Sequence, residues 1–406
     1  MKANRFYFRV LLVAVASFVS CETDGPDDYK NYFIKYYGGD GHQEAKDFVI
    51  NADGTVVILG TSYDANDITR LYLVKVDVEG NVLWQKKIGS TSEYAADIDL
   101  IIAGPDAGKI VLLSNVKKND ADSTAIRLTV VNQEGDSLKS KFFDFLASQR
   151  GRSVTPLDDG GYYVGGNTTD TDAAKNTLLT VPDVEDAIIL KFESDWDDYD
   201  LEQIGSSSVT SVVQIIRQPN AIIFASYSDE LLGAETFYES NFVFRKIENN
   251  DEKTIAVDDP SRVSEYLSAM TRGPFGDYLA TGTQQVENGV NRIYAARINS
   301  GFTTVDEQGV IVGPDRGEGI SVAPSKDGDF WIVGNEILGG GRNIWIGKIE
   351  DALNVSRTYR FGGVNNDDTA SAIRELSNGD LLILGTMELV NQKKMALIKL
   401  KANGSF

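Results

Sequence analysis

The sequence of 406 residues predicts an all-β protein, a seven-bladed β-propeller built from four-stranded antiparallel blades. Three observations carry this prediction. An alternating apolar strand recurs seven times, short Asp-Gly or Asn-Gly turns recur between its copies, and the two ends of the chain complement each other. Val, Ile, Thr and Tyr occur in short runs typical of strands, and no segment has the sustained periodicity of an amphipathic helix.

The alternating strand is the clearest landmark. Each copy ends in a polar turn, and the copies follow one another at intervals of roughly 50 to 60 residues. Four short antiparallel strands fit into one such interval, which is the size of a propeller blade. The copies are Leu71–Gly80, Ile126–Gly135, Ala187–Asp195, Asn241–Asn249, Ile293–Gly301, Ile344–Asp351 and Met395–Gly404.

Two further landmarks divide each interval into strands. A short turn such as Asp53-Gly54 separates the first strand of a unit from the second, and the fourth strand ends in glycine, as at Gly89. The alternating strand is the third. In the first unit the four strands are expected at about Lys46–Asn51, Thr55–Thr61, Leu71–Asp77 and Val82–Ile88.

The ends of the chain supply a missing strand. The seventh unit stops at Phe406, after its third strand, whereas Tyr32–Gly39 is a fourth-type strand with no unit before it. We therefore expect the N-terminal strand to complete the last blade and close the ring. Closure of this kind removes two free sheet edges, which would otherwise invite aggregation.

The N-terminus has the pattern of an exported lipoprotein. Positive charges precede the apolar run Val10–Phe18, which is too short to span a bilayer, and Ser20-Cys21 follows it in a way that resembles a lipobox. This predicts a signal peptide over residues 1–20, lipid attachment at Cys21, an acidic tether over residues 21–31 and the propeller over residues 32–406. The alternative is an ordinary signal peptide with an incidental cysteine. Cys21 is the only cysteine, so no disulfide within the chain can account for it.

One copy of the repeat carries a family resemblance. Val74–Trp84, with the sequence VKVDVEGNVLW, resembles the repeat of tandem-repeat β-propeller lipoproteins of the Bacteroidota, and the likeness extends over residues 31–406. The resemblance implies a propeller that is lipid-anchored in the outer membrane, at the cell surface rather than at the periplasmic face. It implies no activity, because the members of this group are mostly uncharacterised.

Composition limits the chemistry and the partners. The formal charge of −21 argues against nucleic acid as a partner, because such an acidic surface repels phosphate. His42 is the only histidine, so the chain cannot form a histidine cluster for a transition metal, and no Gly-x-Ser-x-Gly motif accompanies it. We expect no catalytic residues, no cofactor and no metal site. Structural calcium at the acidic segments 195–200 and 365–368 is the alternative.

Loop positions single out one face of the propeller, which we call the loop face. The loops that follow the second and the fourth strand of every unit lie on this face, and the former are longest at Thr168–Asp186 and Tyr227–Ser240. Variable loops on a rigid scaffold are where binding usually resides. The candidate binding residues, expected to converge on the mouth of the central channel, are His42, Glu44, Tyr94, Arg152, Arg262, Tyr266, Arg316 and Asp367. Alternatively, these charges pair with one another across neighbouring blades.

Two functions follow from these expectations. The first is a non-enzymatic envelope lipoprotein that binds another envelope protein, or acts as a scaffold, through the loop face. The second is a glycan-binding or glycan-processing accessory lipoprotein of an outer-membrane uptake system, favoured by tyrosine and acidic residues near the expected channel mouth. In both cases the membrane is reached through the lipid on Cys21.

Overall fold

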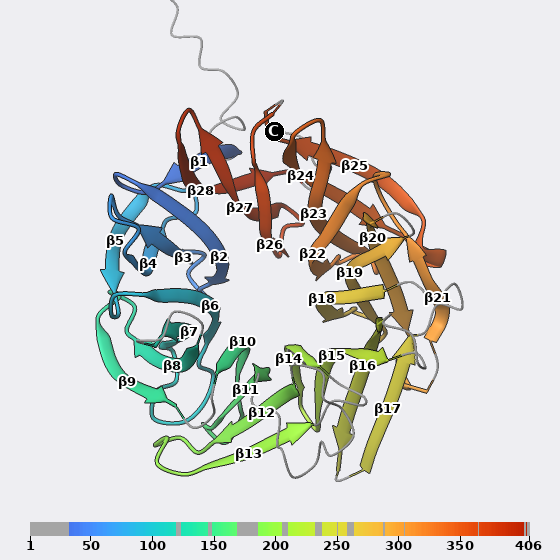
Figure 1. The fold of residues 1–406 in the computed structure, drawn as a ribbon, viewed down its shortest axis with the longest axis horizontal. Helices are drawn as coiled ribbons and strands as arrows, with labels where there is room; N and C mark the ends of the chain where they lie inside the picture. Colours follow the sequence, from blue (N-terminus) through green and yellow to red (C-terminus); the bar gives the residue numbers. More distant parts are fainter. Residues whose placement is uncertain are drawn as a thin grey trace, which may run out of the picture.

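The protein is described by a computed structural model for residues 32–118, 123–144, 148–168, 186–204, 210–231, 238–249, 251–257, 264–286, 289–303, 305–363, 365–401 and 403. The strands form seven four-stranded antiparallel sheets around a central axis (Figure 1). The predicted seven-bladed β-propeller is confirmed. The predicted signal peptide, Cys21 and the tether lie outside the described residues.

Each blade runs from an innermost strand beside the axis to an outermost strand at the rim. The innermost strands are β2 (His42–Ile50), β6 (Glu93–Leu100), β10 (Gln149–Pro156), β14 (Ser211–Gln218), β18 (Ser264–Arg272), β22 (Gly317–Pro324) and β26 (Thr369–Glu375). The second strands are β3 (Val56–Tyr63), β7 (Ile110–Lys117), β11 (Tyr162–Thr168), β15 (Ala221–Leu231), β19 (Tyr278–Val286), β23 (Phe330–Leu338) and β27 (Leu381–Leu389).

The outer half of each blade holds the alternating strand and the strand that ends in glycine. The third strands are β4 (Thr69–Val76), β8 (Thr124–Val131), β12 (Asp186–Phe192), β16 (Tyr238–Glu248), β20 (Val290–Ile298), β24 (Gly341–Ile349) and β28 (Gln392–Leu400). The outermost strands are β5 (Val82–Ile88), β9 (Ser137–Phe143), β13 (Tyr199–Ile204), β17 (Asp251–Val257), β21 (Val305–Ile311), β25 (Val355–Phe361) and β1 (Phe33–Tyr37). A 3-10 helix at Asp351–Leu353 precedes β25. Among the described residues, no helix has the length and apolar character needed to cross a membrane.

The last blade contains strands from both ends of the chain, as predicted. Its order is β1-β28-β27-β26, and β1 pairs antiparallel with β28 from Phe33 opposite Lys399 to Tyr37 opposite Met395. Tyr37 is buried between the seventh and first blades, in a cluster with Phe48 and Leu397. Its hydroxyl donates a hydrogen bond of 2.9 Å to the carbonyl oxygen of Gly80 in the first blade. The N-terminal strand therefore joins the two blades at which the ring closes.

Strand boundaries differ from the expected ones at two places. β2 begins at His42, four residues before the expected Lys46. The mostly polar run His42–Lys46 lacks the apolar alternation that predicts a strand. In the fourth blade, β15 and β16 extend into the segment expected to be a loop, so that Tyr227–Leu231 pair with Tyr238–Phe242. Residues 169–185, which make up most of the first long loop, and residues 232–237, which are part of the second, lie outside the described residues.

Every innermost strand carries a β-bulge at the same level. The register to the second strand slips by one residue there in all seven sheets. A bulge leaves one residue unpaired and redirects its side chain. The bulged residues are Lys46, Ala96, Arg152, Val213, Ser268, Ile320 and Ser371.

The residue of the second strand that faces the bulge is always small. In the third blade a Cβ added to Gly166 would stand 2.0 Å from the carbonyl oxygen of Arg150, so the two backbones approach too closely for a side chain. Serine takes this place in the second and fourth blades, at Ser114 and Ser226. Glycine takes it in the other five, at Gly60, Gly166, Gly282, Gly334 and Gly385.

Gly166→Ala is expected to lower the free energy of unfolding by about 1–3 kcal/mol, because the new methyl group collides with backbone that must move. Gly340→Ala is the matched control, since a Cβ at Gly340 meets no atom within 4 Å. Urea denaturation of both variants measures the difference. Equal stability of the two variants would contradict the close approach of the strands.

The glycine at the end of the fourth strand makes room for a buried polar side chain. Gly89 has a φ of 79°, and a Cβ there would lie 2.4 Å from Oε2 of Glu93, a side chain with 0% of its surface exposed. Glu93 accepts hydrogen bonds from the Ser90 amide (2.6 Å), the Ser114 hydroxyl (2.5 Å) and Nη1 of Arg127 (2.8 Å). The carboxylate thus fastens the loop on the loop face to two strands of the second blade.

Candidate functional site

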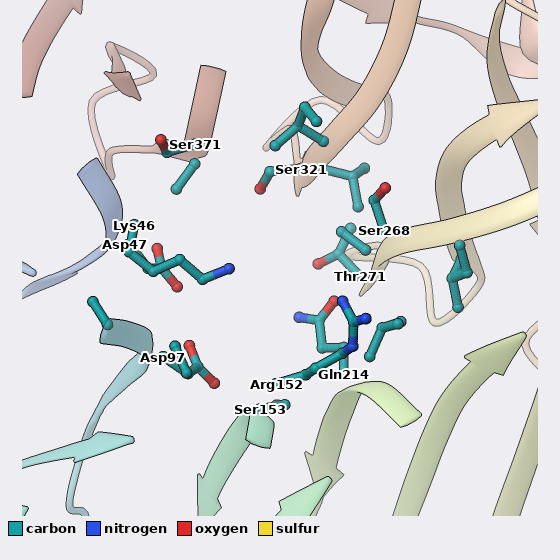
Figure 2. Close-up of a pocket in the computed structure, with 18 of the residues that line it drawn as sticks. Lys46, Asp47, Asp97, Arg152, Ser153, Gln214, Ser268, Thr271, Ser321 and Ser371 are labelled. Atoms are coloured by element: carbon teal, nitrogen blue, oxygen red, sulfur yellow. The ribbon is translucent and has the colours of Figure 1, made fainter. Parts of the chain in front are cut away.

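A cavity of about 600 Å³ lies where the seven innermost strands meet, and all seven bulged residues line it. Ligand sites in proteins commonly have volumes of about 300–1,000 Å³. Figure 2 shows the cavity between the innermost strands, with Lys46 and Arg152 reaching into it. The repeated bulge therefore places one chosen side chain from every blade on the wall of a ligand-sized space.

The cavity wall is charged on one side and neutral on the other (Figure 2). Arg374 of the last blade donates to Asp47, with Nη2 3.0 Å from Oδ1. The other charged side chains that line the cavity are Lys46, Asp97, Arg150 and Arg152, all from the first three blades. The hydroxyl side chains on the neutral side are Ser268, Thr271 and Ser321, whereas Ser371 lies on the charged side and donates to the carbonyl oxygen of Ala45 (3.0 Å).

Side chains just after the bulge fix neighbouring blades to one another. Oδ2 of Asp97 accepts a hydrogen bond of 2.8 Å from the amide of Val154 in the next blade. At the same level, Ser153 accepts from the amide of Ile215 (3.2 Å), and Oε1 of Gln214 accepts from the amide of Met270 (2.7 Å). These bonds satisfy amides beside the bulges, which makes the cavity wall a preorganised surface.

Two carboxyl groups of β6 have raised pKa values. Burial is the largest cause that raises the pKa of Asp97 well above its ordinary value, and the nearby charge of Asp47 adds to it. Burial also raises the pKa of Asp99 to about 6, although an amide hydrogen bond from Leu100 and the charge of Arg374 oppose the shift. Both residues are partly exposed where they line the cavity or its continuation, and the protein around them solvates a charge poorly.

The pKa of Lys46 is also shifted in the direction that disfavours the charged form. Burial in the channel lowers its pKa, and the charge of Arg152 lowers it further, whereas Asp97 and Asp47 oppose the shift. Within the described part of the chain, Lys46 forms no ion pair and no hydrogen bond. Its ammonium group therefore faces the cavity with its charge uncompensated by a direct partner.

The raised pKa values predict a stability that falls as the pH rises. A carboxyl whose pKa is higher in the folded chain binds more protons when folded, so between about pH 4 and pH 7 the folded state loses stability as Asp99 ionises. Asp99→Asn should therefore raise the melting temperature by roughly 2 °C at pH 7 and leave it nearly unchanged at pH 4.5. Differential scanning calorimetry at the two pH values measures this.

Asp53→Asn is the control, because its expected effect on the melting temperature at pH 7 has the opposite sign. Hydrogen bonds from the hydroxyl and amide of Thr55 lower the pKa of Asp53, so this carboxylate stabilises the fold above that pKa. Its loss should lower the melting temperature at pH 7. A rise with Asp53→Asn, or equal shifts of Asp99→Asn at both pH values, would contradict the assignment.

Three of the candidate binding residues meet around one lysine at the junction of the seventh and first blades. Nδ1 of His42 accepts a hydrogen bond of 3.2 Å from the amide of Lys393. Nζ of Lys393 lies 3.0 Å from Oδ2 of Asp367 and 4.0 Å from Oε1 of Glu44. Asp367 also receives Nε and Nη2 of Arg342, at 2.6 and 2.8 Å.

The charged groups of these residues pair with one another across neighbouring blades, which is the alternative to an open binding site. The guanidinium of Arg342, which belongs to the sixth blade, holds the pKa of Asp367 well below its ordinary range. The hydroxyl of Tyr63 donates to Oε2 of Glu44 (2.7 Å), which extends the network toward the second blade. Asp367 lies in the acidic segment 365–368, and its two cationic partners occupy it. Among the described residues, no group of three potential ligands gathers where a metal ion could be held.

Of the other candidates, Tyr94 touches this network through Tyr63, and the remaining described ones lie apart from it. Tyr94 and Tyr266 occupy equivalent places in the second and fifth blades and make edge-to-face contacts with Tyr63 and Tyr227, at 6.5 and 5.8 Å between ring centroids. Arg316 is exposed in the loop before β22. Arg152 is the one described candidate that lines the cavity, where its Nε donates to Asn167 (3.2 Å). Arg262 lies outside the described residues.

Sequence reasoning missed most of the cavity wall. Lys46, Asp47, Asp97 and Gln214 were not singled out, because they lie inside strands rather than in loops. A signal was present: a small residue, a variable residue and then a polar residue precede an apolar residue, as in Ala45-Lys46-Asp47 before Phe48 and Ala95-Ala96-Asp97 before Ile98. This pattern marks the bulge and the residue after it.

The sequence matches no family model, and no curated protein matches it. In fold the chain is similar to two structures of an ulvan lyase, described as a new family of polysaccharide lyase, one of them bound to GlcA(1-4)Rha3S. Each is 9% identical, with 90% of this chain and 96% of the lyase covered, at TM-scores of 0.55 and 0.56.

A weaker likeness links the chain to the acylaminoacyl peptidase of Pyrococcus horikoshii, with 12% identity, 87% of this chain covered and a TM-score of 0.48. This chain spans 50% of the length of that peptidase. At such identities the likenesses concern the fold alone.

Proposed function

We propose that this protein is a non-enzymatic lipoprotein of the outer membrane that binds another envelope protein through its loop face. The observation that carries the proposal is Val390, which is 93% exposed at the tip of the β27–β28 hairpin. Its φ of 59° is a costly conformation for a β-branched residue, and strain of this kind concentrates at functional sites. Asparagine or glycine would be the unstrained choice in such a two-residue turn.

Neighbouring blades extend the exposed apolar surface. Leu389 is exposed beside Val390. Leu338 is exposed at the equivalent corner of the sixth blade, and Ile68 is exposed at the equivalent corner of the first blade. We call these four residues the apolar crest. The chain is strongly acidic, so a partner with apolar groups flanked by basic side chains fits this rim best.

The position of the proposed lipid anchor also favours the loop face as the binding surface. Phe33, at the start of β1, lies beside Gly80 in the turn between β4 and β5, and Nζ of Lys35 donates to the carbonyl oxygen of Glu79 (2.6 Å). The chain therefore enters the propeller on the face opposite the loop face. A tether from Cys21 would hold that opposite face toward the membrane and leave the apolar crest pointing away from it.

Affinity purification tests the proposal. The full-length lipidated protein is purified in mild detergent, after crosslinking, from the membranes of the organism that encodes it. Val390→Asp should abolish recovery of a stoichiometric partner, whereas Val78→Asp, at a site 54% exposed on the opposite face, should leave it unchanged. Recovery of no stoichiometric partner, or equal recovery with both variants, would overturn the proposal.

A second candidate is a glycan-binding accessory protein, and the axial cavity favours it. Its volume of about 600 Å³ and its hydroxyl-lined side suit a short saccharide. Thermal-shift measurements across a panel of neutral and acidic oligosaccharides test this second function, which flat responses throughout would exclude.

A further inference from the structure

We propose that the axial cavity is a binding site for a saccharide that carries a carboxylate, such as a uronic acid, with the carboxylate held between Lys46 and Arg152. This inference deepens the second candidate function and rests on it. It assigns the ligand class from the charge balance of the wall, from the aim of two bulged side chains and from the hydroxyl groups that face them.

The cavity carries an excess of positive charge within an acidic protein. Lys46, Arg150 and Arg152 line it, and in the described part of the chain none of the three forms an ion pair with a carboxylate. Asp47 is matched by Arg374 (3.0 Å), and Asp97 accepts hydrogen bonds from the backbone amides of Val154 (2.8 Å) and Ile98 (2.9 Å). Within a chain of formal charge −21, three cations without an ion-pair partner thus lie together on the wall of one cavity, which attracts anions to that place.

The bulges aim these cations at the same space. Lys46 and Arg152 are the only charged residues among the seven bulged positions, in the first and third blades. Nε of Arg152 donates to Oδ1 of Asn167, which orients the guanidinium and leaves its two terminal nitrogens toward the cavity (Figure 2). A planar guanidinium matches a carboxylate in a bidentate pair, and Lys46 adds a point charge.

The opposite wall suits hydroxyl groups. Ser268, Thr271 and Ser321 line it with side chains that both donate and accept hydrogen bonds. The side chains of this wall are small, and they do not enclose an apolar pocket. A ligand with one carboxylate and several hydroxyl groups would therefore find a partner for each end.

The carboxylate of Asp47 limits the charge of the anion. A phosphate or sulfate ester brings more charge or more acceptor oxygens into a site that already contains Asp47, together with Asp97 when that group ionises. A singly charged carboxylate with two oxygens meets less repulsion. The geometry thus selects a uronic acid over a phosphorylated sugar.

Isothermal titration calorimetry on the full propeller tests the inference. The probes are a trisaccharide of galacturonic acid, a neutral trisaccharide of galactose, inorganic sulfate and inorganic phosphate. The acidic trisaccharide should bind at least about tenfold more tightly than the neutral one, a difference of about 1.4 kcal/mol. Its affinity should also fall as sodium chloride is raised.

Variants locate the site. Lys46→Gln and Arg152→Gln should each weaken binding of the acidic trisaccharide by about tenfold or more. Lys86→Gln is the control, because Lys86 lies on the outermost strand β5 and pairs with Asp136 on the surface. Far-ultraviolet circular dichroism and melting curves establish that each variant is folded, and 2-fold or smaller effects in folded Lys46 and Arg152 variants would overturn the inference.

The outcomes separate this inference from the function on which it rests. Tight binding of neutral saccharides alone would overturn the inference and leave the second candidate function standing. Binding of sulfate or phosphate as tight as that of the acidic trisaccharide would also overturn it, since the site would then recognise charge without the sugar. No binding by any probe would contradict both.

Discussion

Tyr37→Ala is expected to lower the free energy of unfolding by about 3–5 kcal/mol, the usual cost of removing a buried aromatic ring. Tyr37 is 3% exposed, it packs against Phe48 and Leu397, and its hydroxyl bonds to the carbonyl oxygen of Gly80. Because Tyr37 links the N-terminal strand of the seventh blade to the first blade, its loss weakens the place where the ring closes.

The adjacent residue supplies the control. Tyr36 lies on the same strand, is 44% exposed and points away from the core, so Tyr36→Ala should cost no more than about 0.5 kcal/mol. Urea denaturation gives the two free energies, and amide hydrogen exchange of β1 shows whether the strand detaches first. If both variants lost the same stability, strand pairing rather than the Tyr37 contacts would hold the closure.

Glu93→Ala is expected to cost about 3 kcal/mol or more, the range found when one partner of a buried ion pair is removed. The carboxylate is fully buried, and its loss leaves Arg127 and the amide of Ser90 without their partner. The loop between β5 and β6 would then lose its attachment to the second blade.

Two further variants define the cause. Glu93→Gln keeps the shape and the acceptor oxygen and should cost less than Glu93→Ala, since only the charge is lost. Glu134→Ala, at an exposed position in the turn between β8 and β9, should change stability by no more than about 0.5 kcal/mol. Similar effects of Glu93→Ala and Glu134→Ala would contradict the buried pair.

The fold could be predicted because its determinants are local and repeated. Strands such as Leu71–Asp77 are rich in apolar residues and end at a polar turn, and Asp-Gly turns such as Asp53-Gly54 connect strands of the same blade. The closure was also readable, since Tyr32–Gly39 had the form of an outermost strand without a blade of its own. These signals need no knowledge of contacts between distant residues.

The cavity could not be predicted in the same way. Whether Lys46 faces the axis depends on a bulge, and the bulge depends on the pairing of Ala45 with Gly60 on the neighbouring strand. Arg152 is expected in a loop of the loop face, whereas it lies inside β10. The pKa of Asp97 depends on Asp47 in the previous blade, which is a contact between units that no single repeat contains.

The seven bulges have a consequence for how such a protein can change over evolution. The same backbone irregularity accommodates lysine, alanine, arginine, valine, serine and isoleucine, so the fold places little demand on the chemistry of the side chain there. Duplicated blades could therefore diverge at this one position while each kept its sheet, its turns and its glycine. A propeller of this kind can acquire a new ligand by point mutation, and a library varied at the seven positions alone would sample new specificities on an unaltered scaffold.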